Sequence, residues 1–168
     1  RFDTRYTAAR TTPIISQPYG NTEYDLFHFE TISDGESANT KFKISISEIQ
    51  KSSDPKNPYG SFTVQVRDFA DTDRNIRILE RYPNCNLNPV DENYIAKKIG
   101  DMKVFYNFDA ASDSERRLVV EGKNPNKSQY VRVVMNAGFS QVGNIPNSAL
   151  PFGFRGIPSL KTTDSLTE

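Results

Sequence analysis

The sequence of 168 residues has very few of the residues that carry out most enzyme chemistry. It contains one cysteine, Cys85, one histidine, His28, and no tryptophan. A single cysteine excludes a disulfide within the chain and a zinc site built from thiolates. We interpret His28, which lies between two phenylalanines, as a structural histidine. We interpret Cys85, which lies between two asparagines, as a thiol without a catalytic role.

Long apolar runs and an excess of charge of either sign are also absent. The mean hydropathy is −0.63, and no stretch has the length and apolarity of a transmembrane helix. The 21 basic residues balance the 21 acidic ones, so bulk charge does not favour binding to nucleic acid or to an anionic membrane. No signal peptide is recognised. Because the sequence begins without methionine, we expect it to be a fragment or a processed product.

Aromatic residues, in contrast, are plentiful. The chain has 11 phenylalanines and 8 tyrosines, which supply apolar surface at a low cost in side-chain entropy. A chain of this length suits one domain and can bury a core without disulfides or metal. We therefore expect a folded domain rather than a disordered chain.

Apolar and polar residues alternate in several short stretches, as in β-strands with one buried face. The clearest stretches are 42–46 and 62–67, whereas the stretch that begins at Tyr24 has apolar residues on both faces. We expect these three to form an antiparallel meander, because the links between them are short. Further strands are predicted at 76–79, 104–108, 117–121 and 130–135.

One helix is predicted, over residues 91–99. Asp91 begins this stretch, two lysines end it and Gly100 follows, as the helix dipole and C-terminal capping favour. The predicted fold class is α+β and β-rich, with antiparallel, sandwich-like sheets, one main helix and irregular termini. The predicted parts are an irregular N-terminal segment (1–23), a β-rich core domain (24–136) and an extended tail rich in Gly, Pro, Asn and Ser (137–168).

Two groups of acidic residues invite comparison with known sites. Residues 71–75 begin like a calcium-binding EF-hand loop, but Ile76 and Tyr82 stand where that loop needs glycine and glutamate, so we predict a solvated acidic turn. Asp109, Asp113 and Glu115 could form paired carboxylates, but their stretch predicts no apolar pocket that would separate their pKa values. A hydrolase built on these aspartates stays open as an alternative.

The remaining motifs are short. Residues 126–128 match a glycosylation acceptor, a pattern that often arises by chance. Four lysines, Lys41, Lys43, Lys51 and Lys56, are interpreted as the solvated side of a strand and its loop. No phosphate-binding glycine loop and no metalloprotease or serine-hydrolase motif is found. We predict that the chain is not an enzyme, that it has no catalytic, cofactor-binding or metal-binding residues, and that it needs no cofactor.

Several ordered pieces of the sequence resemble the contractile tail sheath proteins of myophages. The resemblance covers about residues 24–101 and a stretch near 151–156. Its pieces are Leu26-Phe27, Gly35, Asn39, Lys43-Ile44-Ser45-Ile46, Gly60-Ser61-Phe62-Thr63, Val66-Arg67, Leu79-Glu80, Asn86-Leu87-Asn88-Pro89, Asn93-Tyr94-Ile95-Ala96, Ile99-Gly100-Asp101 and Pro151-Phe152-Gly153-Phe154-Arg155-Gly156.

This resemblance implies a structural protein of the virion. Sheath subunits stack as hexameric rings around a tail tube, and a baseplate trigger makes the sheath contract and drive the tube through the host envelope during genome ejection. The implied partners are other sheath subunits, the tail tube and the baseplate, with no nucleic acid or membrane. The implied location is the tail sheath, and the host cytoplasm during assembly. Because family subunits are much longer, this chain would be an internal piece, and we expect it to be monomeric alone.

A second function class is kept beside the first. The aromatic content and the many Asn, Ser and Thr residues also suit a carbohydrate- or surface-binding β-sandwich module, although tryptophan, a frequent platform for sugars, is absent. A glycan-array screen would separate the two.

Overall fold

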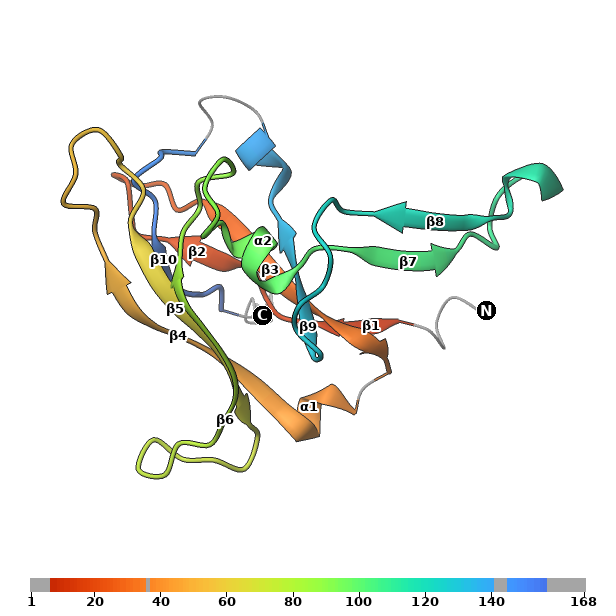
Figure 1. Ribbon diagram of the computed structural model, residues 1–168, viewed down its shortest axis with the longest axis horizontal. Coiled ribbons are helices and arrows are strands. Elements are labelled where there is room, and N and C mark those ends of the chain that lie inside the picture. The colour runs from red at the N-terminus through yellow and green to blue at the C-terminus, as the bar shows by residue number, and fades with distance from the viewer. Residues whose placement is uncertain (1–6, 36, 141–144, 157–168) are drawn as a thin grey trace, which may run out of the picture.

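A computed structural model describes residues 7–35, 37–140 and 145–156 of the chain (Figure 1). The predicted fold class is confirmed, because antiparallel sheets dominate and helices are few and short. The strands are β1 (Ala8–Arg10), β2 (Ile14–Ser16), β3 (Asp25–Asp34), β4 (Phe42–Gln50), β5 (Ser61–Asp68), β6 (Ile78–Cys85), β7 (Lys103–Tyr106), β8 (Leu118–Glu121), β9 (Val131–Met135) and β10 (Pro151–Phe154). The α-helices are α1 (Ala38–Lys41) and α2 (Ile95–Ile99), and 3-10 turns lie at Asp113–Glu115 and Ala137–Ser140.

The first sheet is built around the long strand β3. Strands β1 and β2 pair with β3, β9 also pairs with β3, and β10 extends the sheet by pairing with β2. The β3–β9 register places Phe27 opposite Met135 and Phe29 opposite Val133. All these pairs are antiparallel, and the β3–β9 and β2–β10 pairs join segments that are far apart in the sequence.

The second sheet is the meander β4-β5-β6, and β7 and β8 form a separate two-stranded hairpin. The expected meander of β3, β4 and β5 is therefore wrong, because β3 belongs to the first sheet. The short link between β3 and β4 contains Gly35, whose φ is 89°, and the helix α1. This link carries the chain from one sheet to the other.

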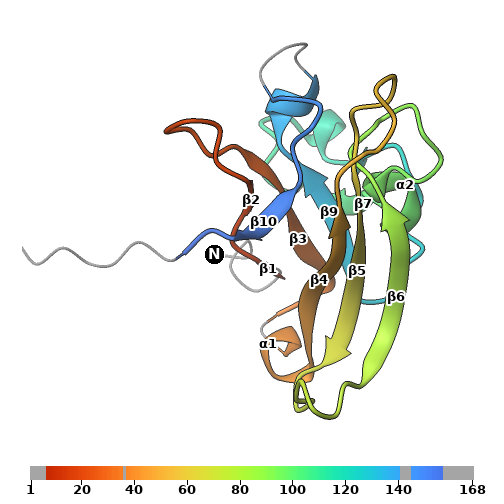
Figure 2. The ribbon, with the colours of Figure 1, turned by 90° about the vertical axis from the view of Figure 1, so that its left-hand side faces the viewer.

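The core lies between the two sheets, which face each other in Figure 2. Phe27 of the first sheet stacks on Phe62 of the second, with ring centroids 6.1 Å apart and planes 13° apart. Val64 and Val66 of β5 are fully buried beside this pair. The predicted alternation in β4 and β5 thus provides the second sheet's contribution to the core. On the outer face of β5, however, Thr63 and Arg67 are also buried, by polar contacts rather than by apolar ones.

The helix α2 is shorter than predicted. It begins at Ile95 rather than at Asp91, because the Asp91 side chain accepts a hydrogen bond from the Asn93 backbone and stabilises a turn instead. Ile95 and Ile99 are fully buried, and the helix ends at Gly100 as expected. In the described part of the chain, no helix has the length and apolarity needed to cross a membrane.

Both terminal segments differ from expectation. The segment predicted to be irregular (1–23) contains β1 and β2, and the segment predicted to be an extended tail (137–168) contains β10. Three- and four-residue strands are too short to show a periodic pattern. The pairing of β2 with β10 joins residues near opposite ends of the chain, so neither stretch alone predicts it. Residues 1–6 and 157–168 lie outside the described residues.

Candidate functional site

One hollow in the described structure is a pocket of about 470 Å³ between the loop that joins β4 to β5 and the segments near residues 17–19 and 148–150. One wall is ordered by hydrogen bonds. The Gln17 amide nitrogen donates to the Tyr19 hydroxyl at 2.9 Å and to the Ser148 carbonyl at 3.0 Å, and the Ser148 hydroxyl lies 2.9 Å from the Tyr19 hydroxyl.

Lys51 and Asp54, a cation and an anion on an exposed loop, also line this pocket. One Asp54 carboxylate oxygen accepts a hydrogen bond from the Lys56 backbone at 2.8 Å. The pocket therefore offers a tyrosine ring, hydroxyls, an amide and both signs of charge. These groups can hydrogen-bond to a neutral ligand that has many hydroxyls.

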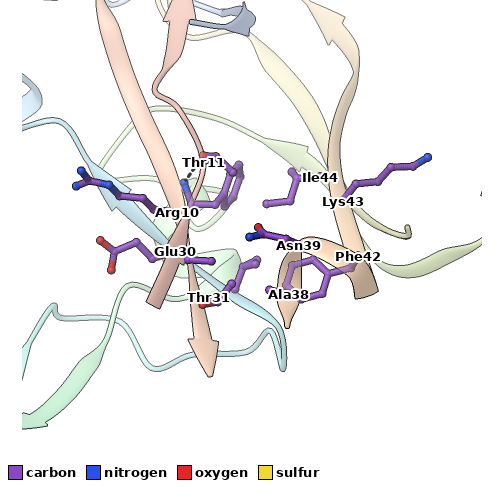
Figure 3. A pocket seen from close by; sticks show the side chains of 12 residues that line it. Arg10, Thr11, Glu30, Thr31, Ala38, Asn39, Phe42, Lys43 and Ile44 are labelled. Carbon is purple, nitrogen blue, oxygen red and sulfur yellow. Dashed lines mark hydrogen bonds between the residues drawn. The ribbon is translucent and has the colours of Figure 1, made fainter. Parts of the chain in front are cut away.

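A smaller hollow is a pocket of about 90 Å³ between β1, β3, α1 and β4 (Figure 3). Arg10 and Glu30 point to one side of it and Lys43 points to the other, while Asn39 lies between them. Its charged residues thus diverge instead of converging on one point. A volume of this size has room for about three water molecules.

His28 lies beside Glu30 on the face of β3 that points away from the core. Its Nε2 is 3.5 Å from a Glu30 oxygen, and Arg132 of β9 donates a short hydrogen bond to the same carboxylate. Burial raises the pKa of Glu30, but the charge and the hydrogen bond of Arg132 outweigh this effect, so the pKa lies below its ordinary value. The contact of Arg132 with Glu30 joins β9 to β3, and His28 lies beside it on β3.

The predicted acidic turn at residues 71–75 joins β5 to β6, but it is not wholly solvated. The Asp71 side chain is 0% exposed and lies 2.7 Å from both Lys43 Nζ and Arg67 Nε. The Arg77 backbone N–H donates a third hydrogen bond to it at 3.0 Å. Asp73, with a side chain 96% exposed, is the solvated one. Within the described ranges, no group of three His, Cys, Asp or Glu residues could hold a metal ion.

Substituting Asp71 should change how stability depends on pH. The hydrogen bonds from Arg67 hold the pKa of Asp71 well below its ordinary value. Its stabilising effect is therefore complete above about pH 4 and is lost as the pH falls towards the folded-state pKa. We expect the free energy of unfolding of Asp71→Asn to be lower at pH 7 and to fall less steeply below about pH 4 than that of the unchanged chain. Urea unfolding from pH 7 to pH 2 measures both effects.

Asp73→Asn is the matched control for this experiment, since it removes a charge from the same turn at an exposed position. We expect its pH profile to follow that of the unchanged chain. If the free energy of unfolding depended on pH in the same way for all three proteins, Asp71 would not be the cause of the predicted loss of stability at low pH.

The other candidate carboxylates, Asp109, Asp113 and Glu115, lie in the link at the tip of the β7–β8 hairpin and are exposed (Figure 1). Asp113 pairs with Arg116 at 2.7 Å, and its side chain is 90% exposed. None of the three lines either pocket described above. The structure therefore leaves these three carboxylates exposed to solvent and does not place them in a common pocket.

Cys85 lies at the buried end of β6. It is 0% exposed, its thiol donates to the Tyr82 carbonyl at 3.3 Å, and burial raises its pKa to about 11. Asn84, with a φ of 53°, lies at an irregularity in the β5–β6 register. Such a bulge redirects the next side chain, which explains how Cys85 comes to face the core.

The asparagine and serine side chains of the glycosylation pattern at residues 126–128 form hydrogen bonds within the fold. The Asn126 amide donates to the Met102 carbonyl at 2.7 Å and accepts from the Met102 N–H at 3.0 Å. Ser128 is buried and donates to Glu80 at 2.6 Å. Among the four lysines, Lys43 belongs to the Asp71 cluster, whereas Lys41, Lys51 and Lys56 are exposed as expected.

The β7–β8 hairpin carries an exposed apolar surface that was not among the sequence-based predictions. We define the hairpin face as Val104, Tyr106, Leu118 and Val120, whose exposed fractions are 58%, 42%, 66% and 57%. Val104 lies opposite Val120 and Tyr106 opposite Leu118, so the four side chains share one side of the β7–β8 hairpin. Figure 1 shows this hairpin projecting away from the two packed sheets.

The sequence did carry a signal for this surface. The runs at 104–106 and 118–120 are apolar at every position, whereas a strand with one wet face would alternate. Comparisons with protein-family models, with curated proteins and with solved structures find no match to this chain.

Proposed function

We propose that this chain is a structural domain of a phage contractile tail sheath, which polymerises around the tail tube and contracts to drive the tube through the host envelope. The observation that carries the structural part of this proposal is the hairpin face. A two-stranded hairpin is marginally stable alone, and an apolar patch on a projecting element is typical of a surface that another chain covers. The sheath itself is proposed on the sequence resemblance.

The architecture suits a subunit that moves as a rigid body. The two sheets share one core through the Phe27–Phe62 stack, so they would move together. In the proposed sheath, subunits pass between two packings of different free energy, and the difference is stored during assembly. Neighbouring sheath subunits, the tail tube and the baseplate are the proposed partners, and the virion tail is the proposed location.

Immunogold electron microscopy tests this proposal directly. Antibodies raised against the purified chain would be applied to contractile-tailed particles released by the cells that encode it. We expect gold particles along the sheath, in extended and contracted tails alike. Labelling of capsids or fibres, or of no particle component, would contradict the proposal.

The pocket beside Tyr19 favours a second candidate function, a carbohydrate-binding module. Its tyrosine ring, amide and hydroxyls are held in place by their own hydrogen bonds, as in a preformed site. In a glycan array, a binding module should give selective signals that Tyr19→Ala removes and that Tyr106→Ala, a change of an exposed tyrosine elsewhere, leaves intact. No selective signal would dismiss this candidate.

A further inference from the structure

In the described part of the chain, the outer edge of strand β8 pairs with no other strand. The Asn107 N–H donates to the Arg117 carbonyl at 3.0 Å. This hydrogen bond shows which of the opposed residue pairs in the hairpin are the hydrogen-bonded ones. In an antiparallel pair, alternate residues direct their backbone groups towards the partner strand. The backbone groups of Arg117, Val119 and Glu121 therefore point to β7, and those of Leu118 and Val120 point outward.

We propose that β8 pairs with β8 of a second copy of this chain, antiparallel, with a two-fold axis at Val119. In this register Leu118 lies opposite Val120 of the second copy, and both have outward-pointing backbone groups. The outward-pointing N–H and C=O groups of the two β8 strands therefore face each other and can form hydrogen bonds. The two hairpins become one four-stranded sheet, and the two hairpin faces become one continuous apolar surface.

The charged residues at the two ends of β8 favour the same register, independently of the backbone hydrogen bonds. With the axis at Val119, Arg117 lies opposite Glu121 of the second copy, and the symmetry repeats this pair. Both are exposed, and neither has an ion pair in the described part of the chain. Opposite charges in directly opposed positions stabilise a strand pair, and like charges destabilise it.

The corresponding edge of β7 fits itself less well. An axis at Phe105 would keep apolar residues opposite each other, but it would bring Asp101 towards Asp109 of the second copy if the pairing continued. Self-pairing through β8 instead brings unlike charges together. The second copy is thus favoured over an unrelated edge strand, because the same five residues, 117–121, supply both sides of the contact.

This inference rests on the hairpin alone and does not depend on the sheath proposal. A two-fold contact is closed and joins two copies only, and the proposed pairing describes the free chain in solution. It also departs from the sequence-based expectation of a monomer.

Sedimentation equilibrium with two charge variants tests the pairing. We expect the unchanged chain to approach twice its mass of 19.0 kDa as its concentration rises. Arg117→Glu and Glu121→Arg should each weaken the dimer by about tenfold or more, because each places like charges opposite each other twice. An equimolar mixture of the two variants should recover the dimer, because every opposed pair is then of unlike charge. Lys56→Glu, on the distant β4–β5 loop, should behave like the unchanged chain.

Recovery on mixing also shows that both variants are folded, so loss of structure cannot imitate the result. The proposal is overturned if the unchanged chain remains a monomer at about 1 mM. Dimers that both variants leave unaffected, a mixture that fails to recover, or open-ended aggregates in place of dimers would overturn it as well.

Discussion

Phe62→Ala should lower the free energy of unfolding by about 3–5 kcal/mol. Phe62 is 1% exposed and stacks on Phe27 across the two sheets, so its removal leaves a cavity where the sheets meet. Domains of this size are stable by only about 5–15 kcal/mol, so the variant should be close to its unfolding limit at 37 °C. Because the chain has no tryptophan, urea unfolding followed by far-UV circular dichroism is the suitable measurement.

Phe69→Ala provides the matched control. Phe69 lies just after β5 and is 50% exposed, so the same change of side chain removes far less buried surface. We expect a loss of about 1 kcal/mol or less. Equal losses at the two positions would mean that the Phe27–Phe62 contact does not hold the sheets together.

Features of the fold that depend on residues close together in the sequence could be predicted, whereas features that depend on pairing between strands could not. Strands β4 and β5 were predicted because alternation within each strand is visible locally. Their assignment to one sheet was also right, since they are joined by a short loop. The placement of β3 in the same sheet was wrong because the link through Gly35, although it is also short, leads from one sheet to the other.

The polar clusters show the same limit. The sequence pointed to Asp71, but it could not show that Lys43 from β4 and Arg67 from β5 would bury its carboxylate. Similarly, the pocket beside Tyr19 is closed by Ser148, which lies 129 residues further along the chain. Such groupings arise only when non-local strands pair, and one sequence carries no direct signal for them.

Gly100→Ala should cost at least as much stability as the loss of a core phenylalanine, about 3 kcal/mol or more. Gly100 ends α2 with a φ of 110° and a ψ of 151°, a region that is essentially restricted to glycine. A Cβ added there would lie 2.3 Å from Asn126 Cα and 2.8 Å from the Pro125 carbonyl oxygen. Both are backbone atoms, so a rotamer change cannot relieve the clash.

The damage should extend beyond the helix. The turn that Gly100 contacts continues to Lys127 and Ser128, whose N–H groups both donate to the Ile99 carbonyl. Gly100 itself accepts a hydrogen bond from Val133 of β9 at 2.9 Å. Moving this turn away from the added Cβ would therefore loosen the attachment of α2 to the first sheet. Hydrogen exchange should show lost protection in α2 and β9 before the rest of the core.

Gly20→Ala separates the steric part of this cost from the conformational part. Gly20 also has a positive φ, 62°, but a Cβ added there would have no atom within 4 Å. Alanine at this position therefore costs only the strain of the left-handed backbone, about 1–2 kcal/mol. The difference between the two variants in urea unfolding then measures the close approach of residues 125–126 to α2. If both substitutions lower the free energy of unfolding equally, the turn at residues 125–126 moves away from the added Cβ at no cost. The close approach at Gly100 would then not hold α2 against β9.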